Sequence, residues 1–77
     1  MTEVYLKKNN DGRFEAYNAL TDKFVSTLTS GNPFMLIDEE TDEEIPGRIE
    51  HNTYGYYWTD TEEFTVVYLK NNLKGYI

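Results

Sequence analysis

The chain has no cysteine among its 77 residues. Disulfide bonds, thiolate zinc sites and cysteine nucleophiles are therefore excluded together. The single histidine, His51, cannot form a multi-histidine metal site. The longest uninterrupted apolar run covers residues 34–37, far short of the ~20 residues that a membrane-spanning helix needs. Residues 1–5 lack the basic start and the apolar stretch of a signal peptide, so we expect a soluble, cytoplasmic protein.

Basic residues are also few. The chain has seven Lys and Arg against fourteen Asp and Glu, which gives a formal net charge of −7. This charge favours solubility and opposes nonspecific binding to nucleic acid or to an anionic membrane. Aromatic side chains are plentiful, with seven Tyr, four Phe and one Trp. Because each can bury roughly 150–250 Å², they can supply the core of a single domain over residues 1–77.

Alternating apolar and polar residues predict an all-β fold. Residues 4–8 and 13–17 alternate on either side of Asp11-Gly12, a pattern typical of a β-hairpin because glycine accepts a positive φ at little cost. Residues 34–37, 45–51 and 64–69 suit further strands by composition. The segment from residue 18 to residue 30 fits either a short helical turn or a strand with an irregular lead-in, and we favour the strand.

These segments predict five to seven short antiparallel strands joined by tight turns. Residues 71–74 could add one short helical turn near the C-terminus. At this chain length, closing the curled sheet into a small barrel is the economical way to remove exposed edges. We find no internal repeat, low-complexity tail or linker.

The excess negative charge belongs to one segment. Between residues 38 and 63 the chain places ten of its fourteen acidic residues against one base, Arg48. Six of the ten fall within residues 38–44. Because these charges repel one another, we expect a solvated loop between two strands. The flanking apolar pattern predicts that the charge is displayed on a folded surface.

Several short motifs resemble those of a known family. The motifs are residues 45–51 (IPGRIEH), 55–57 (GYY), 12–15 (GRFE) and 29–33 (TSGNP). Together they resemble a family of small bacterial domains of unknown function that are often found on mobile elements. The resemblance implies a compact SH3-like β-barrel and no particular activity. Where this chain has residues 38–44, the family usually has a short Asp-Gly-type turn, which suggests that the acidic segment carries this member's own function.

No pattern in the chain indicates an enzyme, a metal site or a cofactor site. A solvated run of carboxylates offers no means of separating two pKa values, which paired acid–base catalysis requires. Read from Asp38 as an EF-hand loop, the run has Glu43 where the motif needs glycine. His51, beside Glu50 and Asn52, is more typical of a surface or capping group than of a pH switch.

The aromatic cluster near residue 56 leaves several possibilities open. Strand parity places Tyr54, Tyr56 and Trp58 on one face and Tyr57 on the other. One face fills the core, and the exposed rings could form a groove for proline-rich peptides, cage a cation or anchor a protein contact. Stacking on single-stranded nucleic acid would need a positive groove, and this is the most negative part of the chain. Direct nucleic-acid binding is therefore disfavoured.

Carboxylates held on a folded surface can imitate a phosphate backbone. They would steer the protein to the cationic channel of a nucleic-acid-binding protein and exclude nucleic acid by competition. We therefore predict a non-enzymatic inhibitor of a basic protein, with an anti-CRISPR protein that blocks an effector nuclease as the concrete case. Alternatives are an SH3-like peptide- or protein-interaction module and a structural accessory domain. The predicted contact residues are Asp38, Glu39, Glu40, Asp42, Glu43, Glu44, Asp60, Glu62 and Glu63, with Tyr56 and Trp58 as apolar contacts.

Overall fold

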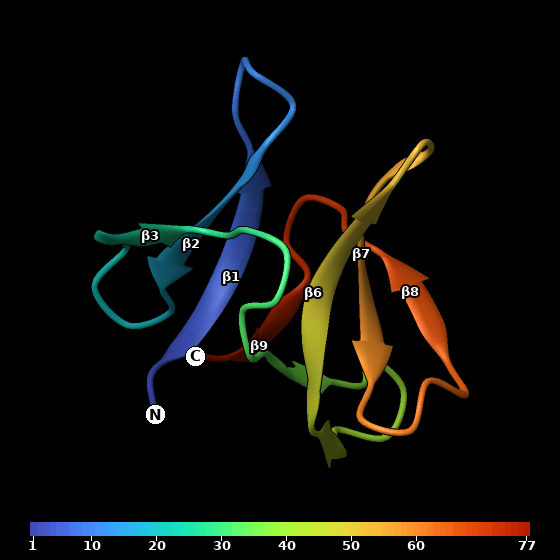
Figure 1. The fold of residues 1–77 in the computed structure, drawn as a ribbon. Helices are drawn as coiled ribbons and strands as arrows, with labels where there is room; N and C mark the ends of the chain where they lie inside the picture. The colour runs from blue at the N-terminus through green and yellow to red at the C-terminus, as the bar shows by residue number, and fades with distance from the viewer.

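A computed structural model describes all residues, Met1–Ile77, and contains nine β-strands and no helix (Figure 1). The prediction of an all-β fold is confirmed, with more strands than the five to seven expected. The extra strands are very short, and β5 has only two residues. The strands are β1 (Glu3–Lys8), β2 (Phe14–Asn18), β3 (Phe24–Thr27), β4 (Met35–Ile37), β5 (Glu44–Ile45), β6 (Gly47–Asn52), β7 (Gly55–Asp60), β8 (Val66–Tyr68) and β9 (Lys74–Tyr76).

The strands form two antiparallel sheets and do not close into a barrel. The six-stranded sheet has the order β3-β2-β1-β9-β4-β5, and the three-stranded sheet has the order β6-β7-β8. The prediction of a closed barrel is therefore wrong. Strands β3 and β8 are edge strands, and Figure 1 places them on opposite sides of the molecule. The other two edge strands are β5, which has two residues, and β6.

The first hairpin forms as its sequence predicts. Strands β1 and β2 pair from Val4↔Asn18 to Lys8↔Phe14. In the connecting turn, the Asn9 side-chain oxygen accepts hydrogen bonds from the backbone amides of Asp11 and Arg13, each at 2.9 Å. Gly12 has a φ of 79°, a conformation that glycine adopts without strain. The ambiguous segment that follows contains strand β3, which confirms the choice of strand over helix.

The expected helical turn at residues 71–74 is absent. Asn71 and Asn72 form a tight reverse turn instead, with Asn72 at a φ of 70°. Two backbone bonds tie this segment to β1: Leu6 donates to Leu73 at 2.9 Å, and Asn72 donates to Leu6 at 2.7 Å. The side-chain oxygen of Asn71 also accepts a bond from the Lys8 amide at 2.8 Å. These sheet-like partners satisfy backbone groups that a helical turn would have paired locally.

One apolar core lies between the two sheets. Trp58, Phe34, Leu6, Leu28, Ile49 and Val4 have almost no exposed surface. The indole Nε1 of Trp58 donates a 2.9 Å hydrogen bond to the Phe34 carbonyl, which joins β7 to the segment before β4. The whole core consists of Val4, Leu6, Phe14, Ala16, Leu28, Phe34, Leu36, Ile49, Trp58, Leu69 and Leu73.

Candidate functional site

The acidic segment is an exposed but well-defined turn between β4 and β5. Asp38 donates its backbone amide to the Glu43 carbonyl at 2.9 Å, and Asp42 donates to the Asp38 carbonyl at 2.9 Å. One carboxylate oxygen of Asp38 accepts bonds from the amides of Glu40 at 2.8 Å and Thr41 at 3.1 Å. Asp42 turns the chain with a φ of 60°, a conformation that Asp tolerates. The turn therefore holds its backbone with its own hydrogen bonds.

The same turn occurs twice in the chain. At residues 18–23, Asn18 takes the place of Asp38: its side-chain oxygen accepts bonds from the amides of Leu20 and Thr21 at 2.8 Å and 3.1 Å. Its amide donates to the Lys23 carbonyl, and Asp22 has a φ of 62°. The sequences, NALTDK and DEETDE, share Asx at the first position and Thr-Asp at the fourth and fifth. The expectation of no internal repeat overlooked this spacing.

The repeated turn shows which acidic side chains the backbone does not need. Ala19, Leu20 and Lys23 stand where the acidic turn has Glu39, Glu40 and Glu43. Since an uncharged or basic side chain supports the same hydrogen bonds, those three carboxylates do not form the turn. Their mutual repulsion makes them unfavourable for folding, so the backbone bonds of the turn do not account for their presence.

Within this turn, the Asp38 carboxylate has a structural role, and that role depends on pH. The amides of Glu40 and Thr41 hold the pKa of the Asp38 carboxyl below its ordinary value of 3.8. A lowered folded-state pKa adds stability above the unfolded-state pKa, and this stability disappears as pH falls through the folded-state value. We therefore expect the urea concentration at the unfolding midpoint to decrease when the pH is lowered below about 4. By NMR, the carboxyl carbon of Asp38 should titrate with a lower pKa than an aspartate in a model peptide.

The matched variant for this prediction is Asp38→Asn. Asn18 makes the equivalent bonds with an amide oxygen, so the variant should keep the turn while losing this part of the pH dependence. Titration of Asp38 at or above its ordinary pKa would contradict the turn geometry.

A second acidic turn joins β7 to β8. One carboxylate oxygen of Asp60 accepts bonds from the amides of Phe64 at 2.7 Å and Thr65 at 3.2 Å. Glu63 has a φ of 63°, and its side chain and that of Glu62 are exposed. As in the first turn, the side chain of an aspartate fixes the backbone, and the glutamate side chains take no part in the backbone bonds of the turn.

The two bases close to these turns are already paired with carboxylates. Arg48 Nε lies 2.7 Å from Glu50, and its Nη2 lies 3.3 Å from Glu63. The hydrogen bond to Glu50 raises the pKa of the Arg48 guanidinium above its already high value. Lys70 Nζ lies 3.1 Å from Glu39. The other carboxylates of the two turns form no ion pair.

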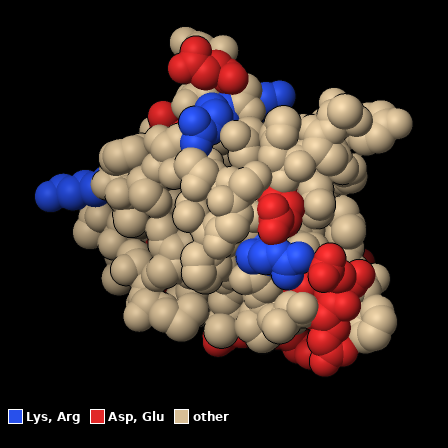
Figure 2. Space-filling view, viewed as in Figure 1, with Lys and Arg blue, Asp and Glu red and all other residues tan.

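The acidic side chains gather at one end of the molecule. Figure 2 shows them mainly at the lower right, over the end of the three-stranded sheet where β7 turns into β8, with most visible basic side chains elsewhere. The negative charge acts on a neighbouring side chain: the carboxylate of Glu44 is the main cause of the raised pKa of Tyr76. We call the surface made by the two turns the acidic face; its residues are Asp38, Glu39, Glu40, Asp42, Glu43, Glu44, Asp60, Glu62 and Glu63.

The two predicted aromatic contacts lie in different environments. Trp58 is fully buried in the core, so the prediction that its ring contacts a partner is wrong. Parity correctly placed Tyr56 on the same face as Trp58, but that face is the inner one. Tyr56 is half-buried, with its ring 4.4 Å from that of His51 and 5.7 Å from the Arg13 guanidinium. The aromatic side chain left most exposed here is Tyr54.

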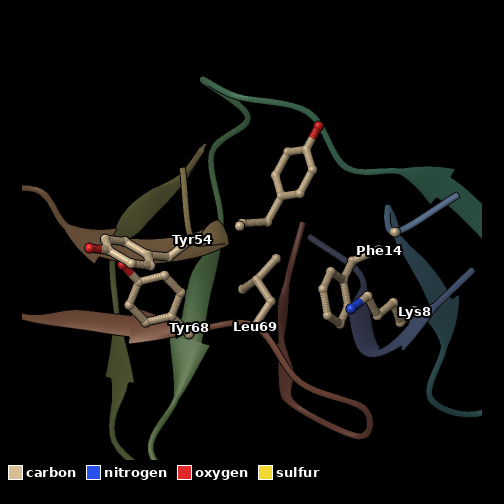
Figure 3. A pocket seen from close by; sticks show the side chains of 8 residues that line it. Lys8, Phe14, Tyr54, Tyr68 and Leu69 are labelled. Atoms are coloured by element: carbon tan, nitrogen blue, oxygen red, sulfur yellow. The ribbon is translucent and has the colours of Figure 1, made fainter. Parts of the chain in front are cut away.

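An aromatic groove of about 410 Å³ lies between the two long hairpins. In Figure 3, Tyr54 and Tyr68 form one side, Phe14 and Lys8 form the other, and Leu69 lies between them. Tyr56, Gly12 and Gly55 complete the lining. The groove lies apart from the acidic turns, because none of their carboxylates lines it.

The comparisons with known proteins give one match. Residues 4–76 match the family model described as a domain of unknown function, DUF5348. No curated protein and no solved structure matches the chain. Within the structure, no group of three or more His, Asp or Glu side chains is arranged to hold a metal ion. No helix is present that could cross a membrane.

Proposed function

The chain belongs to the DUF5348 family, and we propose that this member is a non-enzymatic protein that occupies the basic nucleic-acid-binding surface of a target protein. The concrete case is a cytoplasmic, anti-CRISPR-like inhibitor of an effector nuclease, encoded on a mobile element. On this proposal the two curved sheets are an open variant of the SH3-like arrangement. The acidic face replaces the nucleic acid that the target would otherwise bind.

The main support is the repeated turn. Both copies keep the Asx, Thr and Asp residues that form the backbone bonds, but only the copy at residues 38–43 carries glutamates. The glutamates are therefore additional to the residues that form the turn, which supports a role for them in binding. The second acidic turn lies at the same end of the molecule, where a concentrated negative potential would speed association with a cationic channel.

A turn-swap variant tests the proposal without disturbing the fold. Asp38→Asn, Glu39→Ala, Glu40→Gln and Glu43→Lys give the acidic turn a sequence close to that of residues 18–23. Four carboxylates are lost and one ammonium is gained, so the formal net charge changes from −7 to −2. We expect inhibition of DNA cleavage by a purified effector nuclease to weaken by roughly 100-fold or more, since each lost charge pair can contribute about 1 kcal/mol or more.

The control removes acids outside the acidic face. Glu3→Gln with Asp11→Asn changes charge on β1 and on the first hairpin turn, and inhibition should stay within about twofold. Binding should also fall as salt rises, because screening shortens the range of the attraction. Inhibition that survives both the turn swap and high salt would contradict the proposal.

The aromatic groove supports a second candidate, a module that binds peptides or another protein. Four aromatic rings line it, from Phe14, Tyr54, Tyr56 and Tyr68, and aromatic-lined grooves suit proline-rich segments. The variants already named separate the two candidates. If the groove is the site, the turn swap leaves binding intact and Tyr54→Ala removes it.

A further inference from the structure

Strand β8 has one unpaired edge. It pairs only with β7, and no strand of either sheet lies on its other side. The backbone amide of Leu69 donates to the carbonyl of Tyr56, and the backbone amide of Asp60 donates to the carbonyl of Thr65. Because backbone groups alternate in direction along a strand, the N–H and C=O groups of Val66 and Tyr68 point away from β7.

The side chains along this edge are apolar and exposed. Phe64 is 83% exposed, Val66 is 52% exposed and Tyr68 is 44% exposed. Val66 and Tyr68 lie on the outer face of the sheet, where Tyr57 pairs with Tyr68 at a ring distance of 5.6 Å. Proteins usually protect a free edge of this kind with charge or proline on the strand itself, or with a covering segment. Residues 66–68 carry no charge and no proline, and no strand pairs with their free edge.

A hollow of about 290 Å³ lies on the inner side of β8, next to the acidic turn. Val67, Leu36, Ile37 and Leu73 supply apolar surface, and Asp38, Glu39, Glu40 and Lys70 complete the lining. Lys70 pairs with Glu39, and the Asp38 carboxylate accepts bonds from two backbone amides, so Glu40 carries the carboxylate that has no partner here. Val67 is the residue of β8 that faces inward, because it pairs with buried Trp58. The edge of β8 therefore has apolar side chains on its outer face and carboxylates across a hollow on its inner side.

We infer that the unpaired edge of β8 binds an extended basic segment of the target protein as an added strand. Side chains of such a segment alternate between the two faces. Apolar ones would lie beside Val66 and Tyr68, while Lys or Arg would run along Val67 and place their charges at the carboxylates of the hollow. The segment is thus expected to alternate apolar and basic residues. This inference rests on the proposed function and specifies how the target is held.

Another edge strand, β3, provides an internal comparison. It also has exposed apolar side chains, with Phe24 at 55% and Val25 at 40%. The backbone amide of Leu28 donates to the carbonyl of Phe14. Because backbone groups alternate in direction along a strand, the N–H and C=O groups of Thr27 face away from β2. No run of carboxylates flanks this edge, and Lys23 precedes it. A basic segment should therefore choose β8 over β3.

The test uses two synthetic peptides of about eight residues, a common strand length. One alternates Lys or Arg with Val or Thr, and the other has the same composition with all basic residues in one block. Affinities are measured by calorimetry on the 77-residue chain, and amide hydrogen exchange is followed by NMR. We expect the alternating peptide to bind about tenfold or more tightly and to protect the amides of Val66 and Tyr68. The Thr27 amide should stay unprotected.

Two variants at one position isolate the edge. Val66→Pro removes an N–H that points away from β7, so it spares the pairing with β7 and blocks the added strand. Val66→Thr keeps the N–H and suits a strand. The proline variant should lower binding of the alternating peptide to the level of the blocked peptide, and the threonine variant should bind within about twofold of the original chain.

The outcomes separate this inference from the function on which it rests. Suppose that both peptides bind equally, that this binding is lost at high salt, and that the amides of Val66 and Tyr68 are not protected. This result would overturn the added strand and leave the acidic face as the binding site. Failure of both peptides to bind at low salt would overturn both proposals. If Val66→Pro unfolds, the exchange pattern of the original chain still decides between these outcomes.

Discussion

Replacing Trp58 with alanine should unfold the protein. The side chain has no exposed surface, and it packs between the two sheets. Removing a buried Trp costs about 3–5 kcal/mol in lost transfer free energy and cavity formation. A domain of this size without disulfides or metals rarely has more than about 3–5 kcal/mol of net stability. We therefore expect circular dichroism and urea titration to show little or no folded population at 25 °C.

Two further variants separate size from hydrogen bonding. Trp58→Phe keeps an aromatic ring but leaves the Phe34 carbonyl without its 2.9 Å partner, so it should be less stable than the original chain and still folded. The control is Tyr54→Ala, which removes an aromatic ring that is 86% exposed. It should change the urea midpoint of unfolding very little. If Trp58→Ala unfolds at the same urea midpoint as the original chain, the core is not assembled around Trp58.

The environment of Trp58 illustrates what strand parity can and cannot reveal. Alternation correctly groups Tyr56 with Trp58 and separates both from Tyr57. It does not say which face is the inner one, because both faces of β7 carry aromatic rings. Burial depends on residues outside β7, such as Ile49, which pairs with Trp58 from β6, and Phe34, whose carbonyl accepts the indole hydrogen bond. This information is non-local, so one strand's sequence does not contain it.

Local turn chemistry was the more predictable part of the fold. Asp11-Gly12 correctly predicted the first hairpin because glycine at a positive φ is a local requirement. The paired pattern at Asn18 and Asp38 was equally readable, since both side chains bond to amides two and three residues ahead. At residues 38–43 the shared Asx and Thr-Asp positions lie within a run of acidic side chains, which the copy at residues 18–23 does not have.

Closure of the sheet was the least predictable feature. The sequence has enough strand-like segments for a barrel, but closure depends on whether the final strands are long enough to meet. Strand β8 has three residues, and the chain leaves it for the turn at Asn71 and Asn72, which pairs with β1. The same short strand leaves the open edge beside the acidic turn. A candidate binding surface thus arises where the barrel prediction failed.

Replacing Gly75 with alanine should be the most damaging single-methyl change in β9. Gly75 pairs with Val4 on one side and Leu36 on the other, in the middle of the six-stranded sheet. A Cβ there would overlap the Phe34 ring and the Met35 carbonyl oxygen. Because that oxygen belongs to the backbone of a neighbouring strand, it can give way only if β4 shifts. Overpacking of this kind costs about 1–3 kcal/mol, and we expect the upper end, measured as a lower urea midpoint.

A double-variant cycle with Phe34 tests the cause of that loss. Phe34→Leu shortens the side chain that the new methyl meets, so the loss caused by Gly75→Ala should be smaller in the Phe34→Leu background, by about 0.5 kcal/mol or more. The contact with Met35 is backbone and should persist, so rescue should be incomplete. Lys74→Ala on the same strand changes an exposed side chain and should leave the midpoint nearly unchanged. Strict additivity of the Gly75 and Phe34 variants would mean that the Phe34 ring does not limit the space at Gly75.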